Sequence, residues 1–205
     1  DLPDAMSEME VRRRLEELDR KNRHLTIMAG GGAYDHYAPA VVPALTSRSE
    51  YLTAYTPYQA EISQGTLRYI FEFQSMIATL TGMDCANASM YDGATAAAEA
   101  MMMAMAATRK KTRVLLSSTL LPQVREVVHT YAKYHGVELS EIASADGQTD
   151  IDDAHRLLEA GDVAGVLVPS VNRFGIVEDL SGFAEAAHAQ KALLMVYADP
   201  SALAV

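Results

Sequence analysis

The stretch Val163-Ala164-Gly165-Val166-Leu167-Val168 decides the fold of this chain, because it is a short run without a single polar residue. A run of this length that is apolar at every position is typical of a strand buried on both faces, as in a parallel sheet covered by helices. Further strands are predicted at 114–117, 137–142 and 193–197, and helices at 94–108, 122–135, 152–160 and 180–190. Strand and helix therefore alternate from residue 85 onward. This pattern predicts a three-layer α/β/α domain with a mainly parallel sheet.

The first 84 residues carry a helical pattern instead. Ser7 with Glu10 forms a capping box that opens a helix, with Val11, Leu15 and Leu18 on one face. A second helix is expected from about Ser63 or Thr66 to Thr81, ended by Gly82. Its stripe consists of Leu67, Ile70, Phe71, Gln74, Ile77 and Leu80, which we expect to lie in the core. We therefore predict a helical N-terminal extension with an interface segment over 1–84, and a partial large α/β domain over 85–205.

Composition excludes several classes of function. The chain has 205 residues, of which 49% are hydrophobic, so it is long enough for one large domain. Its 27 acidic and 17 basic residues give a net charge of −10, and the basic residues cluster only at 12–14 and 109–111. Nucleic acid is therefore a poor candidate partner.

The single cysteine bears on the cellular compartment and on metal binding, and the longest apolar run bears on membrane insertion. Cys85 alone permits neither an internal disulfide nor a multi-cysteine metal site, which fits a reducing cytoplasm. The longest apolar run, 100–107, is far shorter than the roughly 20 residues that a membrane span needs. We expect a cytoplasmic protein with no metal site and no membrane partner.

Four segments are dense in polar groups without being linkers or charge runs. They are Gly30–Tyr37, Tyr55–Gly65, Ser89–Thr95 and Ala198–Pro200. Together, from about Gly30 to Leu203, they resemble the alpha-type subunits of glycine dehydrogenase (decarboxylating), the P-protein of the glycine cleavage system. The resemblance implies the fold of the pyridoxal-phosphate enzymes of the aspartate-aminotransferase type. Because the chain starts at Asp1 and stops just after a predicted strand, we expect it to be truncated.

Two segments depart from the family pattern. The family commonly shows His-Pro-Glu-Tyr-Arg where this chain has Leu121-Pro122-Gln123-Val124-Arg125. It also shows an Asn-Pro-Asn-Phe type of run where this chain has Ser170-Val171-Asn172-Arg173-Phe174. No role can be assigned to the histidine and asparagine that are absent.

One group of residues matches the cofactor positions of that fold. The turn with Ser89, Gly93, Ala94 and Thr95 precedes a helix, whose free amides and dipole suit a phosphate, although an ordinary capped helix has the same pattern. The resemblance implies that this turn corresponds to the cofactor phosphate site. It likewise places Asp199, which follows an apolar strand, against the pyridine nitrogen. The alternative for Asp199 is a cap on the next turn.

The lysine that bonds the cofactor covalently in this fold is missing. Only six residues follow Asp199, and none of the lysines, at 21, 110, 111, 133 and 191, is predicted at the carboxyl end of a strand. In the family, the beta-type subunit holds pyridoxal phosphate and the alpha-type subunit lacks the lysine. The resemblance therefore implies that the cofactor-like positions of this chain are vestigial, and that no residue of the chain alone is catalytic.

The remaining polar residues are candidates for a cleft at the subunit interface. In the family, the active site lies between the two subunit types, so the resemblance implies a cleft for glycine and for the lipoyl arm of the H-protein. The candidates are Tyr34, Asp35, His36, Tyr55, Thr56, Tyr58, Gln59 and Glu61. Tyrosine offers rigid apolar area and one hydrogen-bonding group. The alternatives are a loop packed on its own domain and, for His36, a structural hydrogen bond.

Three functions remain open on the sequence. The resemblance implies a subunit that takes part in decarboxylating glycine and in passing the aminomethyl group to the lipoyl group of the H-protein, active only with its beta-type partner. A second reading is a scaffold that only stabilises the partner. A third is an independent pyridoxal-phosphate enzyme truncated before its lysine.

Overall fold

The structure is a computed structural model that describes residues 3–23, 25–26, 31, 36–108 and 110–204. It divides into two compact units, Asp1–Tyr34 and Asp35–Val205. The predicted boundary between residues 84 and 85 is a different division and stays a prediction.

The first unit contains the helix α1 (Glu8–Asp19), and its predicted capping box is confirmed. The Ser7 amide donates to Glu10 Oε2 over 2.7 Å, and the Glu10 amide donates to Ser7 Oγ over 3.4 Å. No residue of α1 is buried, and Leu15 is 60% exposed.

A parallel sheet forms the centre of the second unit. It consists of β1 (Arg113–Ser117), β2 (Glu138–Ile142), β5 (Val163–Pro169) and β6 (Leu193–Tyr197), in the order β2-β1-β5-β6. All four strands were predicted, because each is a short apolar or half-apolar run between helical patterns. A small antiparallel hairpin of β3 (Ser144–Ala145) and β4 (Gln148–Thr149) was not predicted, since two-residue strands carry no periodicity.

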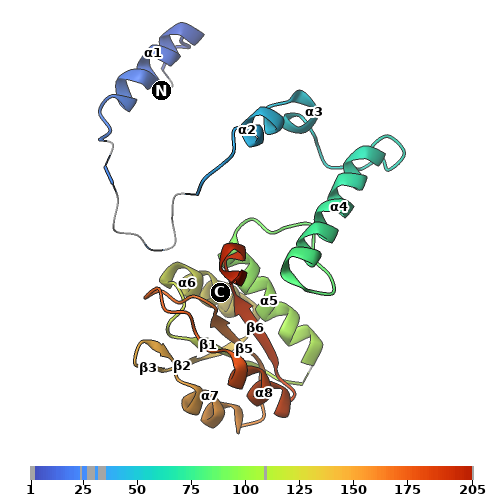
Figure 1. The fold of residues 1–205 in the computed structure, drawn as a ribbon, viewed down its shortest axis with the longest axis vertical. Helices are drawn as coiled ribbons and strands as arrows, with labels where there is room; N and C mark the ends of the chain where they lie inside the picture. Colours follow the sequence, from blue (N-terminus) through green and yellow to red (C-terminus); the bar gives the residue numbers. More distant parts are fainter. Residues whose placement is uncertain (1–2, 24, 27–30, 32–35, 109, 205) are drawn as a thin grey trace. The chain divides into compact units, whose positions relative to one another are not determined.

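Helices cover both faces of this sheet (Figure 1). On one face, α5 (Gly93–Thr108) and α6 (Pro122–His135) form a core with Leu116 and Leu167. On the other face, α7 (Ile151–Leu158) and α8 (Ser181–Ala189) form a second core with Leu115 and Val166. Neighbouring residues of one strand thus enter opposite cores, which confirms the three-layer α/β/α fold. A short 3-10 helix, η1 (Pro200–Ala204), follows β6.

Gly165 lets the central strand β5 approach its neighbours closely. A Cβ atom at this position would lie 2.7 Å from Met195 Cε, 3.0 Å from Ala104 Cβ and 3.3 Å from the Leu193 carbonyl oxygen. Any larger residue would therefore push α5 and β6 away from the sheet.

The helices α2 (Val41–Thr46), α3 (Ser49–Leu52) and α4 (Gln64–Thr81) precede the sheet in the chain. The predicted end of α4 is confirmed, because Gly82 takes the left-handed conformation with φ of 70°. The prediction that the stripe of α4 lies in the core is wrong. No residue of α4 is buried, and Phe71 and Leu80 are each 67% exposed.

Hydrophobic periodicity alone led to the wrong prediction for α4. Arg68, Glu72, Ser75 and Thr79 form one polar strip of α4, and most of the remaining circumference is apolar, interrupted by Thr66, Gln74 and Thr81. Such a pattern shows that a helix has a face to bury. It does not show whether the same chain supplies the cover, and the described part of this chain does not.

Candidate functional site

The carboxyl ends of β1, β5 and β6 lie along one edge of the sheet, because the strands are parallel and paired in register. Open α/β sheets bind ligands at this edge. Two elements next to the predicted cofactor-like positions meet here, since Gly93 at the start of α5 lies against Tyr197 at the end of β6.

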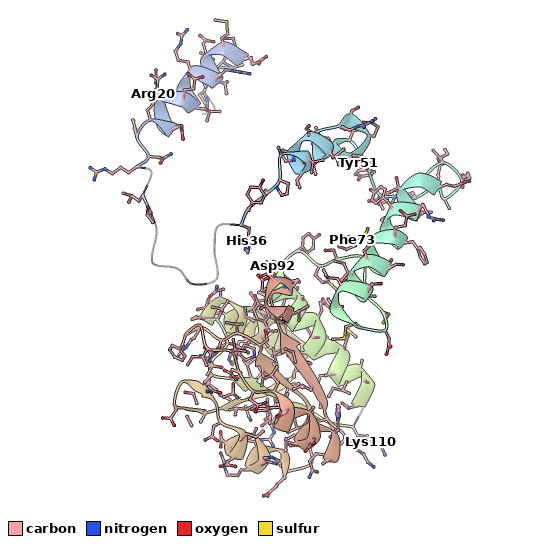
Figure 2. All side chains as sticks on the ribbon, viewed as in Figure 1. Arg20, His36, Tyr51, Phe73, Asp92 and Lys110 are labelled. Atoms are coloured by element: carbon pink, nitrogen blue, oxygen red, sulfur yellow. The ribbon has the colours of Figure 1, made fainter. Side chains whose placement is uncertain are left out.

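Asp92 caps the N-terminus of α5 and is labelled in Figure 2. Its Oδ1 accepts a hydrogen bond from the Thr95 amide over 2.7 Å. This hydrogen bond is the main reason why the pKa of Asp92 lies below its ordinary value. A negative charge of the chain itself therefore stands where the helix dipole would favour a bound anion.

Tyr197 fills the space beside Gly93. A Cβ atom on Gly93 would lie 2.8 Å from the Tyr197 hydroxyl and 3.0 Å from its Cε2 atom, so glycine is required there. Burial, and then the charges of Asp92 and Asp199, raise the pKa of Tyr197 above its ordinary value. The phenol is therefore neutral at physiological pH.

Asp199 caps the turn that follows β6, as the alternative interpretation predicted. Its Oδ1 accepts hydrogen bonds from the Ser201 amide over 2.8 Å and from the Ser201 hydroxyl over 2.5 Å. The hydroxyl, then the amide, lower the pKa of Asp199, and the charge of nearby His36 adds to them. The assignment of Asp199 to a cofactor nitrogen stays a prediction.

Ser89 lies in the loop that leads into α5. Its φ angle is 125°, a region that residues other than glycine rarely adopt, and its amide donates to Asn87 Oδ1 over 3.1 Å. The predicted positions Ser89, Gly93, Ala94 and Thr95 thus form the entry to α5, but their proposed link to a phosphate stays a prediction.

These residues do not fit a covalently held pyridoxal phosphate. The amide of Thr95 is engaged by Asp92, the carboxylate of Asp199 is engaged by Ser201, and Tyr197 covers Gly93. Of the lysines in the described ranges, Lys111 and Lys191 precede strands, Lys133 lies in α6, and Lys21 and Lys110 follow helices. None of these described lysines stands at the carboxyl end of a strand.

A buried carboxylate at the same edge was missed by sequence reasoning. Glu178 is 6% exposed and accepts three hydrogen bonds. Its Oε1 receives the Thr119 hydroxyl over 2.6 Å and the Asn172 amide group over 2.8 Å, and its Oε2 receives the Thr149 amide over 3.2 Å. Glu178 therefore joins the loops that follow β1 and β5 to the strand β4. An isolated acidic residue after a strand carries no pattern that separates this role from a solvated one.

The Tyr55–Glu61 segment lies between α3 and α4 and is ordered by its own backbone. The Tyr58 amide donates to the Thr56 carbonyl over 2.8 Å, and Gln64 Nε2 donates to the Glu61 carbonyl over 3.2 Å. The rings of Tyr55 and Tyr58 stand 6.2 Å apart and are 80% and 79% exposed.

This exposure contradicts the alternative that the segment packs on its own domain. Thr56, Gln59 and Glu61 are exposed as well, so the structure leaves the segment available to a partner but does not test the predicted cleft. The candidates Tyr34 and Asp35 lie outside the described residues.

The described residues contain neither a cluster of metal ligands nor a membrane-spanning helix. No three His, Cys, Asp or Glu side chains among them gather as metal ligands. None of the helices in these ranges has the length and apolar character that a membrane crossing requires.

Comparison with known proteins places the chain in a family. The family model described as "Glycine cleavage system P-protein" matches residues 1–205. The chain belongs to the P-protein family. It is 52% identical over 203 residues to the probable glycine dehydrogenase (decarboxylating) subunit 1 of Moorella thermoacetica, and 50% identical over 202 residues to the same subunit of Bacillus subtilis.

Solved structures agree with this assignment. The chain superimposes on a crystal structure of glycine decarboxylase (P-protein) of the glycine cleavage system in inhibitor-bound form, with a TM-score of 0.92 and 42% identity, covering 100% of this chain and 46% of the other. It also shares the fold of a Burkholderia pseudomallei sphingosine-1-phosphate lyase, with a TM-score of 0.70 at 15% identity, covering 96% and 48%. The fold is that of the pyridoxal-phosphate enzymes of the aspartate-aminotransferase type.

The chain matches only part of its relatives. The match with the Moorella protein covers 98% of this chain and 45% of that protein. The match with the Bacillus protein covers 97% of this chain and 45% of that protein. It therefore spans about half the length of the curated relatives it matches.

Proposed function

We propose that this chain is part of the alpha-type subunit of glycine dehydrogenase (decarboxylating), the aminomethyl-transferring enzyme of the glycine cleavage system. The complex decarboxylates glycine and passes the aminomethyl group to the lipoyl group of the H-protein in the cytoplasm. The carrying observation is a contrast within the chain. The side chains at the cofactor-like edge are engaged with one another, while α4 and the Tyr55–Glu61 segment are uncovered.

We propose that the beta-type partner holds pyridoxal phosphate. The support is that Asp92 already occupies the N-terminus of α5, and that Tyr197 stands against Gly93. This arrangement also disfavours an independent pyridoxal-phosphate enzyme, since a phosphate would meet a carboxylate at the helix start. By itself the chain is expected to be inactive.

We assign the cleft-lining role to the exposed polar segment before α4. In the complex, Tyr58 contributes a rigid ring and a hydroxyl donor, and Glu61 contributes an acceptor that orients the amino group of glycine. We assign Tyr55, Thr56, Gln59 and His36 to the same cleft, and Tyr34 and Asp35, which lie outside the described residues, stay predictions for it. Exclusion of water from this cleft strengthens each of these polar contacts.

Two substitutions in the full-length subunit test this role. Tyr58→Phe and Glu61→Gln each remove one polar interaction without changing the size of the side chain. We expect glycine–bicarbonate exchange by the reconstituted pair, at saturating H-protein, to fall on the order of 100-fold, as for a hydrogen bond that strengthens in the transition state. Subunit association should not change.

Tyr134→Phe is the matched control, because Tyr134 lies in α6 and is 78% exposed, close to the 79% of Tyr58. We expect its exchange rate to equal that of the wild type. Full activity of both Tyr58→Phe and Glu61→Gln would leave the chain as a scaffold that only stabilises its partner.

The cofactor assignment has its own test. The full-length subunit and its partner are each incubated with pyridoxal phosphate, freed of excess cofactor and reduced with borohydride. We expect a labelled lysine only in the partner. A labelled lysine in this subunit would mean that the subunit itself carries the cofactor.

A further inference from the structure

One arginine stands apart from the others of the second unit. Within the described part of residues 36–204, the other arginines each pair with a carboxylate within 4.0 Å: Arg48, Arg68, Arg113, Arg125 and Arg156. Arg173 has no carboxylate partner among the described residues, although the chain has a net charge of −10. Among the described residues of the second unit, Arg173 is thus the arginine whose charge no carboxylate of the chain neutralises.

The side chain of Arg173 is held against an aromatic ring. Its Cζ atom lies 4.7 Å from the centroid of the Phe174 ring, within the range of a cation–π contact. Both residues are exposed, and Phe174 shows 55% of its surface to solvent. The stacking fixes the plane of the guanidinium and leaves its N–H groups free to donate.

The loop that carries this pair is anchored from inside. Asn172 Oδ1 accepts from the amides of Phe174 and Ile176 over 2.9 and 3.2 Å, and its Nδ2 donates to Glu178 and to the Gly147 carbonyl over 2.8 and 2.7 Å. A bridge between Val171 and Val177 closes the loop into a hairpin.

Further bonds attach this hairpin to the neighbouring loops. The Arg173 amide donates to the Thr119 carbonyl over 2.9 Å, and buried Glu178 receives the Thr119 hydroxyl. Because the backbone is fixed on several sides, the Arg173–Phe174 pair loses little conformational entropy when it binds.

We propose that the Arg173–Phe174 pair is a preformed contact for a carboxylate of the partner subunit, an inference that rests on the proposed function. Charge complementarity selects an anion, and the guanidinium fork matches a carboxylate with two parallel hydrogen bonds. The exposure of both side chains selects a protein surface over a small molecule, since small ligands bind in pockets that bury most of their area. Arginine and aromatic residues are also enriched where partners bind most strongly.

The position of the loop fits such a contact. The Ser170 amide donates to the Tyr197 carbonyl over 2.9 Å, which ties the start of the loop to the end of β6. The pair therefore belongs to the carboxyl edge of the sheet, the edge at which Gly93 and Tyr197 meet.

The test measures the affinity of the full-length subunit for its partner subunit at low and high sodium chloride. Arg173→Gln should weaken binding roughly 10-fold at low salt, as for the loss of one charge-assisted pair, and by less at high salt. Arg173→Lys should fall between Arg173→Gln and the wild type, because lysine keeps the charge but not the fork.

Arg156→Gln is the matched control, since Arg156 is exposed but already paired with Asp153. It should bind like the wild type. Equal affinity of Arg173→Gln and Arg156→Gln would overturn the inference and leave the proposed function intact, as would a loss at Arg173 that does not depend on salt. A wild-type subunit that fails to bind the partner would instead refute the proposed function, and the inference with it.

Discussion

Apolar side chains are packed into two cores in the region from Gly93 to Tyr197. They are left uncovered in the region from Val41 to Thr81. In the first, the sheet and its four covering helices form two cores in which Met101, Leu116 and Val166 are at most 1% exposed. In the second, no residue of α2, α3 or α4 is buried. Figure 2 labels Lys110 in the first region, and Tyr51 and Phe73 in the second.

The two regions differ in whether other described residues of the chain cover their apolar surface. A layered sheet covers its own apolar area, so its stability is local to the chain. A helix that is apolar over most of its circumference is stable in water only when another surface covers it. The first region therefore determines the fold of the chain. We expect the second region to bind another protein surface.

The largest expected effect is a loss of stability in the first region. Gly165→Val places atoms within 2.7 Å of Met195 Cε and 3.3 Å of a backbone carbonyl, so it should cost about 3 kcal/mol or more in the free energy of unfolding. Urea unfolding of the full-length subunit would measure this loss. Gly182→Ala is the control, because its Cβ would lie an ordinary 3.5 Å from Ile151, and its stability should stay within about 1 kcal/mol. Equal stability of the two variants would refute the packing at Gly165.

A smaller effect is expected from the buried carboxylate. Glu178→Gln replaces a carboxylate that accepts three hydrogen bonds by an amide whose NH2 group would face a donor, and it should cost about 2 kcal/mol. The matched variant Glu185→Gln changes an exposed carboxylate in α8 and should leave the free energy of unfolding unchanged. A Glu178→Gln protein as stable as Glu185→Gln would show that the network does not anchor the loops.

Substitutions in the second region should weaken binding to the partner without changing the stability of the subunit. Phe71→Gln and Leu80→Gln alter side chains that are each 67% exposed, so the thermal unfolding of the isolated subunit should not change. Association with the partner should weaken roughly 30-fold, as for the loss of about 2 kcal/mol at an interface. Glu72→Gln, on the polar strip of α4, should bind normally. Loss of stability without loss of binding would place the cover of α4 within the subunit itself.

The smallest effect is a pH-dependent one in the first region. Asp153 Oδ2 accepts from the Ala143 amide over 2.9 Å, and this bond is the main cause of its lowered pKa, with Arg156 adding to it against the cost of burial. Because the pKa of the folded state is lowered, the stabilisation is present above the ordinary value and disappears as pH falls through the folded-state pKa.

Asp153→Asn should therefore cost about 1 kcal/mol at neutral pH, and the difference from the wild type should shrink in acid. Unfolding at neutral and acidic pH measures both. A difference that grows as pH falls would contradict the direction of the pKa shift.

Much of the fold was predictable because its signals are local. Continuous apolar runs gave β5 and β6, and Gly82 and Gly136 ended α4 and α6 as left-handed caps. The β3–β4 hairpin was missed, because its strands are too short for any period to appear.

Of the candidate site, the sequence predicted the positions of some residues but not their contacts. Gly93 and Asp199 fall at the carboxyl edge, since the strand pattern fixes that edge. The Glu178 network and the engagement of Asp92 with Thr95 depend on contacts between distant or unpatterned residues, which no spacing encodes. The cover of α4 was mispredicted for a similar reason, because hydrophobic periodicity names a buried face but not the chain that buries it.

The most direct test of the account is glycine–bicarbonate exchange during titration of the full-length subunit into its pyridoxal-phosphate-loaded partner, with H-protein in excess. We expect no exchange by this subunit alone and a rate that rises until the two subunits are equimolar, because we propose that the uncovered region completes the partner's site. Exchange by this subunit alone, or a partner that is equally active without it, would contradict the account.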